Sequence, residues 1–243
     1  MHLPYFEVEE LPGDIMRCPA LPVWFNVQRI HKSMRFRPGS RDEAAFDGMV
    51  QRAQANGRPK AVYRPARVTD HVDEGVTIEG VRFDSPLLYR QLAGIHRVFP
   101  YVVTCGRELD ALDSLSRTPL ERYYWGEICT AIMRGAHKLM RTHLLHRFQI
   151  PATSYLSPGS GAAWLWPVDQ QGKLFSLLGD APASIGVTLT DSDLMIPSRS
   201  ISGLHYPSEK AFRTCRACRL ENCPDRLAPF DPNLWNELKQ IKS

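Results

Sequence analysis

The chain has 243 residues, 43% of them hydrophobic and 23% charged, so it can bury a sizeable core as one large or two small domains. Its net charge of +4, from 30 Lys and Arg against 26 Asp and Glu, is a weaker basic bias than nucleic-acid-binding proteins usually carry. No apolar run approaches the roughly 20 residues that span a bilayer, and the N-terminus, MHLPYFEVEELPGD, lacks the order of a signal peptide. These features favour a cytoplasmic protein with neither a membrane nor a nucleic acid as partner.

The first part of the chain predicts one helix and a group of short strands. Residues 1–24 are rich in turn-forming residues and are expected to form an N-terminal extension. Residues 41–56 place apolar side chains at helical spacing, and Gly57 supplies a stop. Residues 60–83 alternate as short strands do, with the sequence DEG suited to a hairpin turn.

The middle of the chain predicts a capped helix, a buried strand and the longest helix. Ser85 followed by Pro86 is typical of a helix start. The sequence RVFPYVVTCG predicts a buried strand that ends at Cys105. Residues 120–148 then show helical periodicity. The apolar side chains expected on the buried face of that helix are Ile128, Ile132, Ala136, Leu139 and Leu144.

After Pro151 the composition of the sequence changes. The Ser/Gly/Pro-rich stretch YLSPGSGAAWLWP predicts a loop, and a short helix closed by Gly179 follows it. The sequence SIGVTLTDSDLMIPSRSISGLHY predicts a strand, a loop and a second strand. The whole pattern predicts an α+β fold with a central, mainly antiparallel sheet flanked by helices.

One string in this region is long enough to suggest a family. The activation domain of cobalamin-dependent methionine synthase carries the pattern G-V-x-L-T-x-S-x-M-x-P-x-x-S-x-S-G, and residues 186–203 resemble it. The matching residues are Gly186, Thr188, Leu189, Thr190, Ser192, Met195, Pro197, Ser200, Ser202 and Gly203.

The resemblance covers roughly residues 25–210 and implies a single helmet-shaped domain. Proteins of this family dock over the cobalamin of a corrinoid-binding protein or methyltransferase. In methionine synthase the domain also binds S-adenosylmethionine, which remethylates the cofactor after a reductase has supplied an electron. The resemblance therefore implies cobalamin supplied by a partner, with a reductase as a further partner.

The resemblance also implies a set of cofactor-binding residues, with two departures. In the family, the S-adenosylmethionine loop runs R-x-x-x-G-Y. Aligned on Gly159, this chain has Tyr155 in place of the arginine and Ser160 in place of the tyrosine. A phenol cannot make the bidentate contact of a guanidinium with a carboxylate, so we expect weak S-adenosylmethionine binding. The candidate cofactor-binding residues are Tyr155, Ser157, Gly159, Ser160, Thr188, Thr190, Ser202 and Gly203.

Three cysteines near the C-terminus lie outside the family pattern. Cys215, Cys218 and Cys223 follow a C-x2-C-x4-C spacing within the sequence TCRACRLENCPDR. In a reducing compartment such a cluster indicates a metal more than disulfides. A structural zinc site usually offers two C-x2-C pairs and only one is present, so an iron–sulfur cluster, expected as 4Fe-4S, is favoured and zinc is the alternative. Residues 211–243 are accordingly expected to form a Cys-rich metal-binding tail.

A fourth ligand would have to come from elsewhere in the chain. Cys105, Cys129 and Cys18 are the candidates, with His205 in reserve. We favour Cys105 because it ends a strand in a turn that lies near the functional cleft in the family.

Three functions are compatible with these patterns. The first is an accessory protein of corrinoid-dependent methyl transfer, which assists reduction or remethylation of cobalt through an iron–sulfur centre. The second is an S-adenosylmethionine-dependent reactivating enzyme that retains the ligand site through other residues. The third is a zinc-stapled module that binds a protein. The sequence does not decide whether the chain is an enzyme.

Overall fold

A computed structural model describes residues 4–113, 118–223 and 226–242. No helix within these ranges is long and apolar enough to cross a membrane. The strands are β1 (Glu9–Leu11), β2 (Ile15–Cys18), β3 (Lys60–Tyr63), β4 (Ala66–Val72), β5 (Gly75–Ile78), β6 (Val81–Asp84), β7 (Arg97–Thr104), β8 (Thr153–Leu156), β9 (Thr188–Leu189), β10 (Met195–Ile196) and β11 (Ser200–Pro207).

The helices fall between these strands and at the C-terminal end. They are α1 (Val27–Met34), α2 (Arg41–Asn56), α3 (Pro86–Gln91), α4 (Arg107–Asp113), α5 (Pro119–Arg147), α6 (Gln171–Ser176), α7 (Ala181–Ser184) and α8 (Pro232–Ile241), with the 3-10 helices η1 (Val168–Gln170) and η2 (Thr214–Ala217).

The main sheet is antiparallel throughout and is organised around β7. Its strand order is β1-β2-β3-β7-β4-β5-β6, while β11 pairs with β7 and also with β8. In the β11–β7 pair, Ser200 lies opposite Thr104 and His205 lies opposite Phe99. The strands β9 and β10 form a separate two-stranded hairpin. The α+β fold with a mainly antiparallel sheet is therefore confirmed.

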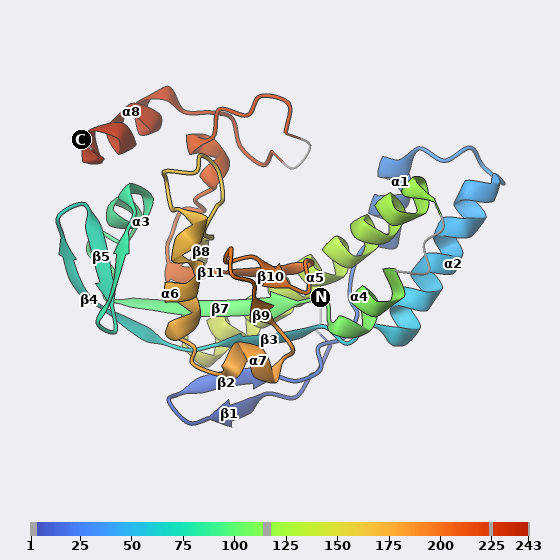
Figure 1. The fold of residues 1–243 in the computed structure, drawn as a ribbon, viewed down its shortest axis with the longest axis horizontal. Coiled ribbons are helices and arrows are strands. Elements are labelled where there is room, and N and C mark those ends of the chain that lie inside the picture. Colours follow the sequence, from blue (N-terminus) through green and yellow to red (C-terminus); the bar gives the residue numbers. More distant parts are fainter. Residues whose placement is uncertain (1–3, 114–117, 224–225, 243) are drawn as a thin grey trace.

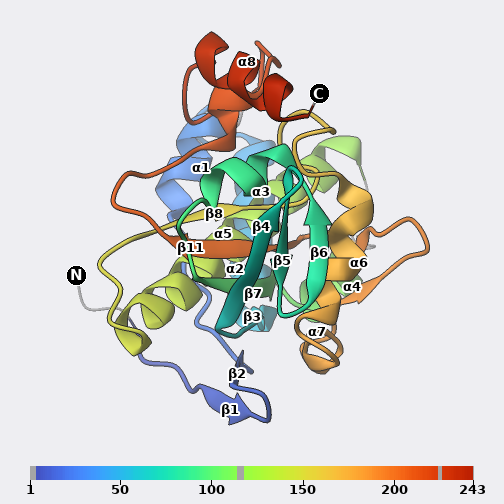
Figure 2. The same ribbon diagram turned by 90° about the vertical axis from the view of Figure 1, so that its left-hand side faces the viewer.

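The elements form a floor with two arms (Figure 1). The floor consists of β7, β3, β2 and β1. One arm carries β4–β6, α3 and α8, and the other carries α1, α2, α4 and the first turns of α5. The hairpin β9–β10 lies between the arms, and the view turned by 90° shows β4–β6 in front of the remainder of the sheet (Figure 2).

Residues on β7 alternate between the two faces of the sheet, as the two-residue period of a strand requires. Phe99, Tyr101 and Val103 pack against α5, whereas Val98 and Val102 face the opposite side. The five apolar residues predicted for the inner face of α5 are all buried. This helix therefore covers one face of the floor, and β11 is fixed between it and the elements on the other face.

Several local predictions are confirmed by cap geometry. Helix α2 begins after Ser40, whose side chain accepts a hydrogen bond from the backbone of Glu43, and it ends before Gly57. Helix α3 has Ser85 as its cap and Pro86 in its first turn. The turn between β4 and β5 contains Asp73 and Glu74, both with positive φ, as a two-residue hairpin of this kind demands.

Both terminal segments are part of the fold. The predicted extension, residues 1–24, contributes β1 and β2 to the sheet, and Met16 and Cys18 are buried in the core. The predicted tail, residues 211–243, contributes buried side chains to the same core cluster as Leu165 and Trp166. The division of the sequence at residues 24 and 210 remains a prediction, and it does not coincide with separate hydrophobic cores.

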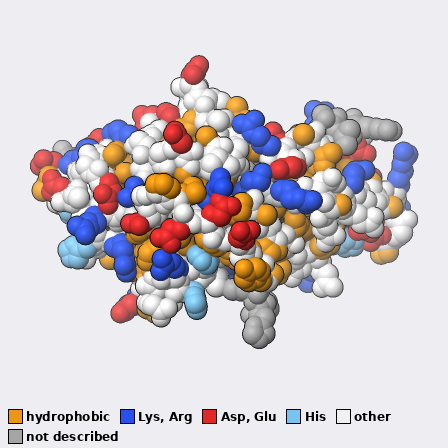
Figure 3. Space-filling view, turned by 90° about the horizontal axis from the view of Figure 1, so that it is seen from below, with side chains coloured by type: hydrophobic (Ala, Val, Ile, Leu, Met, Phe, Trp, Pro, Cys, Tyr) orange, Lys and Arg blue, Asp and Glu red, His pale blue; other side chains and the backbone are white. Residues whose placement is uncertain are grey.

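The surface seen from below interleaves acidic, basic and apolar side chains (Figure 3). No extended surface of one charge sign covers this face of the described residues. A nucleic-acid-binding face would be expected to gather Lys and Arg. The face seen in Figure 3 therefore lacks the basic surface expected of a nucleic-acid-binding protein.

Candidate functional site

The first half of the family string forms the hairpin β9–β10. Thr188 lies opposite Ile196 in the hairpin. The backbone of Thr190 donates to the carbonyl of Leu194 at 2.9 Å, and its hydroxyl accepts from the backbone of Leu194 at 3.1 Å. Thr190 therefore closes the hairpin turn, a role that its position in the string did not predict.

Ser202 links the hairpin to the sheet. Its hydroxyl is buried and donates to Gln171 Oε1 at 2.9 Å. Gln171 Nε2 in turn donates to the carbonyl of Asp193 at 2.6 Å. This relay joins β11, α6 and the hairpin on one face of the sheet.

Gly203 lies on the opposite face of β11 and has no room for a side chain. A Cβ at this position would lie 2.1 Å from the carbonyl oxygen of Leu156, 2.9 Å from Ser157 Oγ and 3.0 Å from Tyr101 Oη. The glycine is therefore required for close packing of β8 on β11. A large residue at position 203 would displace β8.

Two buried hydroxyls surround Gly203. Neither Tyr101 Oη nor Ser157 Oγ makes a hydrogen bond of good geometry with any described residue. Burial raises the pKa of Tyr101, and the neighbouring Ser157 hydroxyl opposes that shift. The base of the predicted ligand loop therefore has unused hydrogen-bonding capacity.

The loop of residues 157–161, here called the glycine loop, is held by its backbone. Gly159 has a φ of 71° and donates to the carbonyl of Trp166 at 2.8 Å, while Ser160 donates to the carbonyl of Ser157 at 3.2 Å. Gly161 has a φ of 86°, and a Cβ there would lie 2.9 Å from Thr214 Cγ2. The glycine loop and the C-terminal segment therefore pack directly on one another.

Tyr155, at the family's arginine position, packs against a buried pair of histidines. Its ring lies 4.9 Å from that of His137 and 5.5 Å from that of His205. The two histidines share a hydrogen bond of 2.8 Å between their Nε2 atoms, and His205 Nδ1 lies 3.2 Å from Thr153 Oγ1. Tyr155 thus supplies an aromatic wall and leaves no positive charge at its own position.

The histidine pair is neutral. Burial, together with the nearby positive charge of Arg141, lowers the pKa of His137 to about 3. Burial also holds the pKa of His205 well below its ordinary value, and His137 and Arg141 add to the effect. Both ring nitrogens of His205 are engaged within the protein, which leaves it poorly suited to the reserve ligand role predicted for it.

The three tail cysteines lie in a loop organised by one arginine. The tail loop comprises residues 213–231, described except for 224–225. Arg226 donates to the carbonyls of Cys215 at 3.2 Å, Cys218 at 3.0 Å and Ala228 at 3.1 Å. The backbone of Leu227 donates to Cys215 Sγ at 3.5 Å. All three cysteines are partly exposed free thiols.

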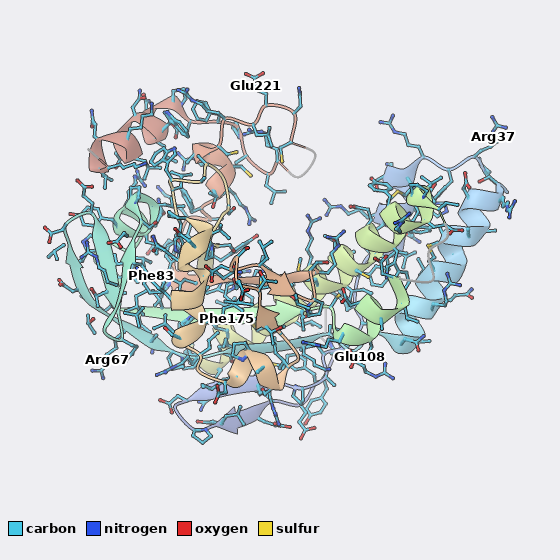
Figure 4. The ribbon with its side chains drawn as sticks, in the orientation of Figure 1. Arg37, Arg67, Phe83, Glu108, Phe175 and Glu221 are labelled. Carbon is cyan, nitrogen blue, oxygen red and sulfur yellow. The ribbon has the colours of Figure 1, made fainter. Side chains whose placement is uncertain are left out.

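The tail loop is also fixed to the body of the protein. Ala217 is fully buried in the core that contains Trp166. The guanidinium of Arg219 lies 4.6 Å from the ring centre of Trp235, and that ring makes an edge contact with Trp164 at 5.1 Å. Figure 4 shows Glu221 on the outer side of this loop, pointing away from the body.

The structure does not bring Cys105 to the tail loop. Cys105 and Cys129 are buried together in the core between α2, α4 and α5. Cys105 follows Thr104, which lies opposite the first residue of β11. The tail leaves β11 at its other end, and at the usual rise per residue the length of the strand places that end about 25 Å from Thr104. Cys18 is buried in a separate cluster, where desolvation raises its pKa to about 12. Within the described ranges, no three His, Cys, Asp or Glu side chains are already arranged to hold a metal ion.

The predicted residues therefore fall into two groups. Tyr155, Ser157, Ser160 and the tail cysteines lie on connected segments around the glycine loop, while Thr188, Thr190 and Ser202 lie on the hairpin side of the sheet. The sequence reasoning missed His137 as the partner of His205. His137 lies on the buried face of α5, one residue after Ala136, and this position was the sequence signal that its side chain would be buried.

Comparison with known proteins supports the fold alone. No protein-family model and no curated protein matches the sequence. The chain is similar in fold to a crystal structure of the MetH reactivation domain bound to AdoHcy, with a TM-score of 0.55 and 13% identity over 82% of this chain and 80% of that one. The fold that the sequence resemblance implied is thus confirmed.

The histidine pair predicts a specific loss of stability in acid. A histidine whose pKa is lower in the folded state contributes stability above its unfolded value of 6.5, and that contribution falls as the pH drops toward the folded pKa. We expect the free energy of unfolding to fall by about 1–3 kcal/mol between pH 7.5 and 5.5, measured by urea denaturation.

The double variant His137→Gln/His205→Gln should have a flatter pH profile, whereas His96→Gln, at an exposed position, should keep the original slope. An unchanged slope in the double variant would show that other groups dominate acid destabilisation.

Proposed function

We propose that this chain is an accessory protein of corrinoid-dependent methyl transfer, which docks on a corrinoid-binding protein and assists reduction or remethylation of its cobalt. The observation that carries the proposal is the agreement of the family string in residues 186–203 with the fold similarity to the MetH reactivation domain. The corrinoid cofactor belongs to the partner, so this chain has to recognise a protein surface.

The exposed apolar side chains of the described residues support a docking face. Leu194 on the hairpin is 57% exposed, and Leu220 and Leu227 in the tail loop are 61% and 62% exposed. Leu120 and Tyr123 in the first turns of α5 are also exposed. These segments lie around the region between the two arms (Figure 1). Exposed apolar groups gathered on neighbouring elements are typical of protein-binding surfaces.

Docking is tested with substitutions that leave the core untouched. Leu194→Ser and Leu227→Ser should each weaken binding to a methionine synthase corrinoid domain loaded with cob(II)alamin, by about fivefold or more, because each removes apolar contact area. Binding is measured by calorimetry. Val72→Ser, at an exposed position on β4, is the matched control and should bind as the original chain does. Equal affinity for all three variants would contradict this docking face.

The tail cysteines are proposed to hold a metal centre that takes part in electron transfer. Cys215 and Cys218 lie at one 3-10 turn, where side-chain rotation can bring their sulfurs together, and Cys223 lies in the same loop. Arg226 has no carboxylate partner among the described residues, and its contacts are all backbone carbonyls. Three thiolates would compensate that positive charge, and the amide of Leu227 already points at Cys215 Sγ. The residues therefore fit a thiolate-bound metal.

The placement of Cys105 changes the proposal for the fourth ligand. A buried thiol in another core cannot reach the tail loop without rearrangement of that core. We therefore assign the fourth position to a ligand from outside the chain. An iron–sulfur cluster would supply one-electron chemistry, whereas zinc would only stabilise the loop.

Metal content is tested by single substitutions after anaerobic reconstitution with ferrous iron and sulfide. Serine at position 215, 218 or 223 should lower bound iron to a small fraction of the original, because each removes one of the three ligands that the chain itself supplies. Cys105→Ser and Cys129→Ser should keep it. Iron is measured by elemental analysis and cluster formation by visible absorption. Full metal content in all three tail variants would refute the centre, and one zinc per chain without iron would favour the binding-module alternative.

A further inference from the structure

Two of the tail cysteines lie at the two ends of a single 3-10 turn. Helix η2 spans Thr214–Ala217, and Cys218 follows it directly. The backbone of Cys218 donates to the carbonyl of Cys215 at 3.2 Å, so the turn closes between these two residues. With three residues per turn and a rise of about 2 Å per residue, residues i and i+3 of such a turn lie on the same side, with Cα atoms about 6 Å apart. A disulfide spans Cα separations of about 4.4–6.8 Å, so the backbone of this turn fits one.

The turn is held in this conformation by its surroundings. Arg226 Nη1 donates to the carbonyl of Cys215 at 3.2 Å, and its Nη2 donates to the carbonyl of Cys218 at 3.0 Å. Between the two cysteines, Ala217 is fully buried in the core. Because one guanidinium binds both ends of the turn, a bond between the sulfurs requires rotation of two side chains and no rearrangement of the backbone. This preorganisation lowers the entropic cost of closing the ring.

The two thiols of the turn are accessible but not equivalent. Both are partly exposed, whereas Cys18, Cys105 and Cys129 are buried. Cys215 Sγ accepts a hydrogen bond from the backbone of Leu227 at 3.5 Å, and the Arg226 guanidinium binds the carbonyl of the same residue. A partly exposed sulfur in an electropositive setting is typical of reactive cysteines, while buried thiols in apolar surroundings are inert. Cys215 is therefore the better placed of the two to attack a disulfide.

We propose that Cys215 and Cys218 exchange reversibly with small disulfides such as glutathione disulfide. The Cys215 sulfur attacks one sulfur of glutathione disulfide, which breaks the S–S bond and releases the first glutathione thiol. The Cys218 sulfur then attacks the mixed disulfide at Cys215 and releases the second glutathione thiol. The two protons of the cysteines leave on the two glutathione thiols, and two electrons pass from the protein dithiol to the small disulfide.

This activity goes beyond the proposed function, since it needs neither a corrinoid partner nor a metal. It has one consequence that rests on the proposed metal centre. The disulfide form has lost two of the three thiolates that the chain offers to a metal, so oxidation of the turn would prevent loading of the centre.

Exchange is tested on the metal-free full chain, prepared with a chelator and a reductant and equilibrated with mixtures of reduced and oxidised glutathione. Alkylation and peptide mass spectrometry should find one disulfide, between Cys215 and Cys218. Cys218→Ser should instead accumulate glutathione on Cys215, because the resolving thiol is absent. Cys223→Ser is the matched control and should form the disulfide at the same glutathione ratio as the original chain. Thiols that stay reduced at every ratio, or a disulfide that includes Cys223, would overturn the inference.

The contribution of the arginine is measured in the same experiment. Arg226→Gln should require about a threefold or greater increase in the ratio of oxidised to reduced glutathione for half-oxidation, because closure must then order the turn. Arg216→Gln is its control, since Arg216 lies in the turn but pairs with Asp231. Thermal unfolding checks that both variants are folded. An equal midpoint for Arg226→Gln and the original chain would overturn the role assigned to Arg226.

Iron uptake separates this inference from the proposed metal centre. The oxidised chain should take up little iron and sulfide until dithiothreitol reduces it, and equal loading of the oxidised and reduced forms would overturn the control of loading. Exchange in a chain that binds no iron in either form would reject only the proposed metal centre. Iron binding without exchange would reject only this inference.

Discussion

The pairing of β11 with both β7 and β8 is the constraint on which the rest of the structure depends. It requires a residue without a side chain at Gly203, where the carbonyl of Leu156 and the hydroxyl of Tyr101 leave no space. Because successive residues of a strand face opposite sides, the same pairing directs Ser202 to the hairpin and His205 to the buried histidine pair. β11 then continues into the tail, which places the cysteine loop beside the glycine loop.

Much of this arrangement could be predicted from local signals. The stop at Gly57, the cap at Ser85, the hairpin turn at residues 73–74 and the apolar face of α5 each depend on neighbouring residues alone. The family string identified the segment that forms β9, β10 and β11. These predictions succeeded because the physical cause of each feature lies within a few residues of chain.

The remainder depended on contacts between distant segments. Cys105 was expected to complete the tail site, but the antiparallel direction of β11 carries the tail to the opposite end of the strand. Residues 1–24 contain many turn-forming residues, yet Met16 and Cys18 are buried by strand pairing. His137 and Arg141 acquire their surroundings from β8 and β11, which periodicity within α5 cannot reveal.

The central claim is that the surface between the arms receives a corrinoid protein. Hydrogen–deuterium exchange of the chain, with and without a corrinoid domain carrying cob(II)alamin, tests it most directly. The account predicts slower exchange in residues 190–197, in the tail loop and at the start of α5, with β4–β6 unchanged. Slower exchange confined to β4–β6, or no change anywhere at saturating partner concentration, would contradict it.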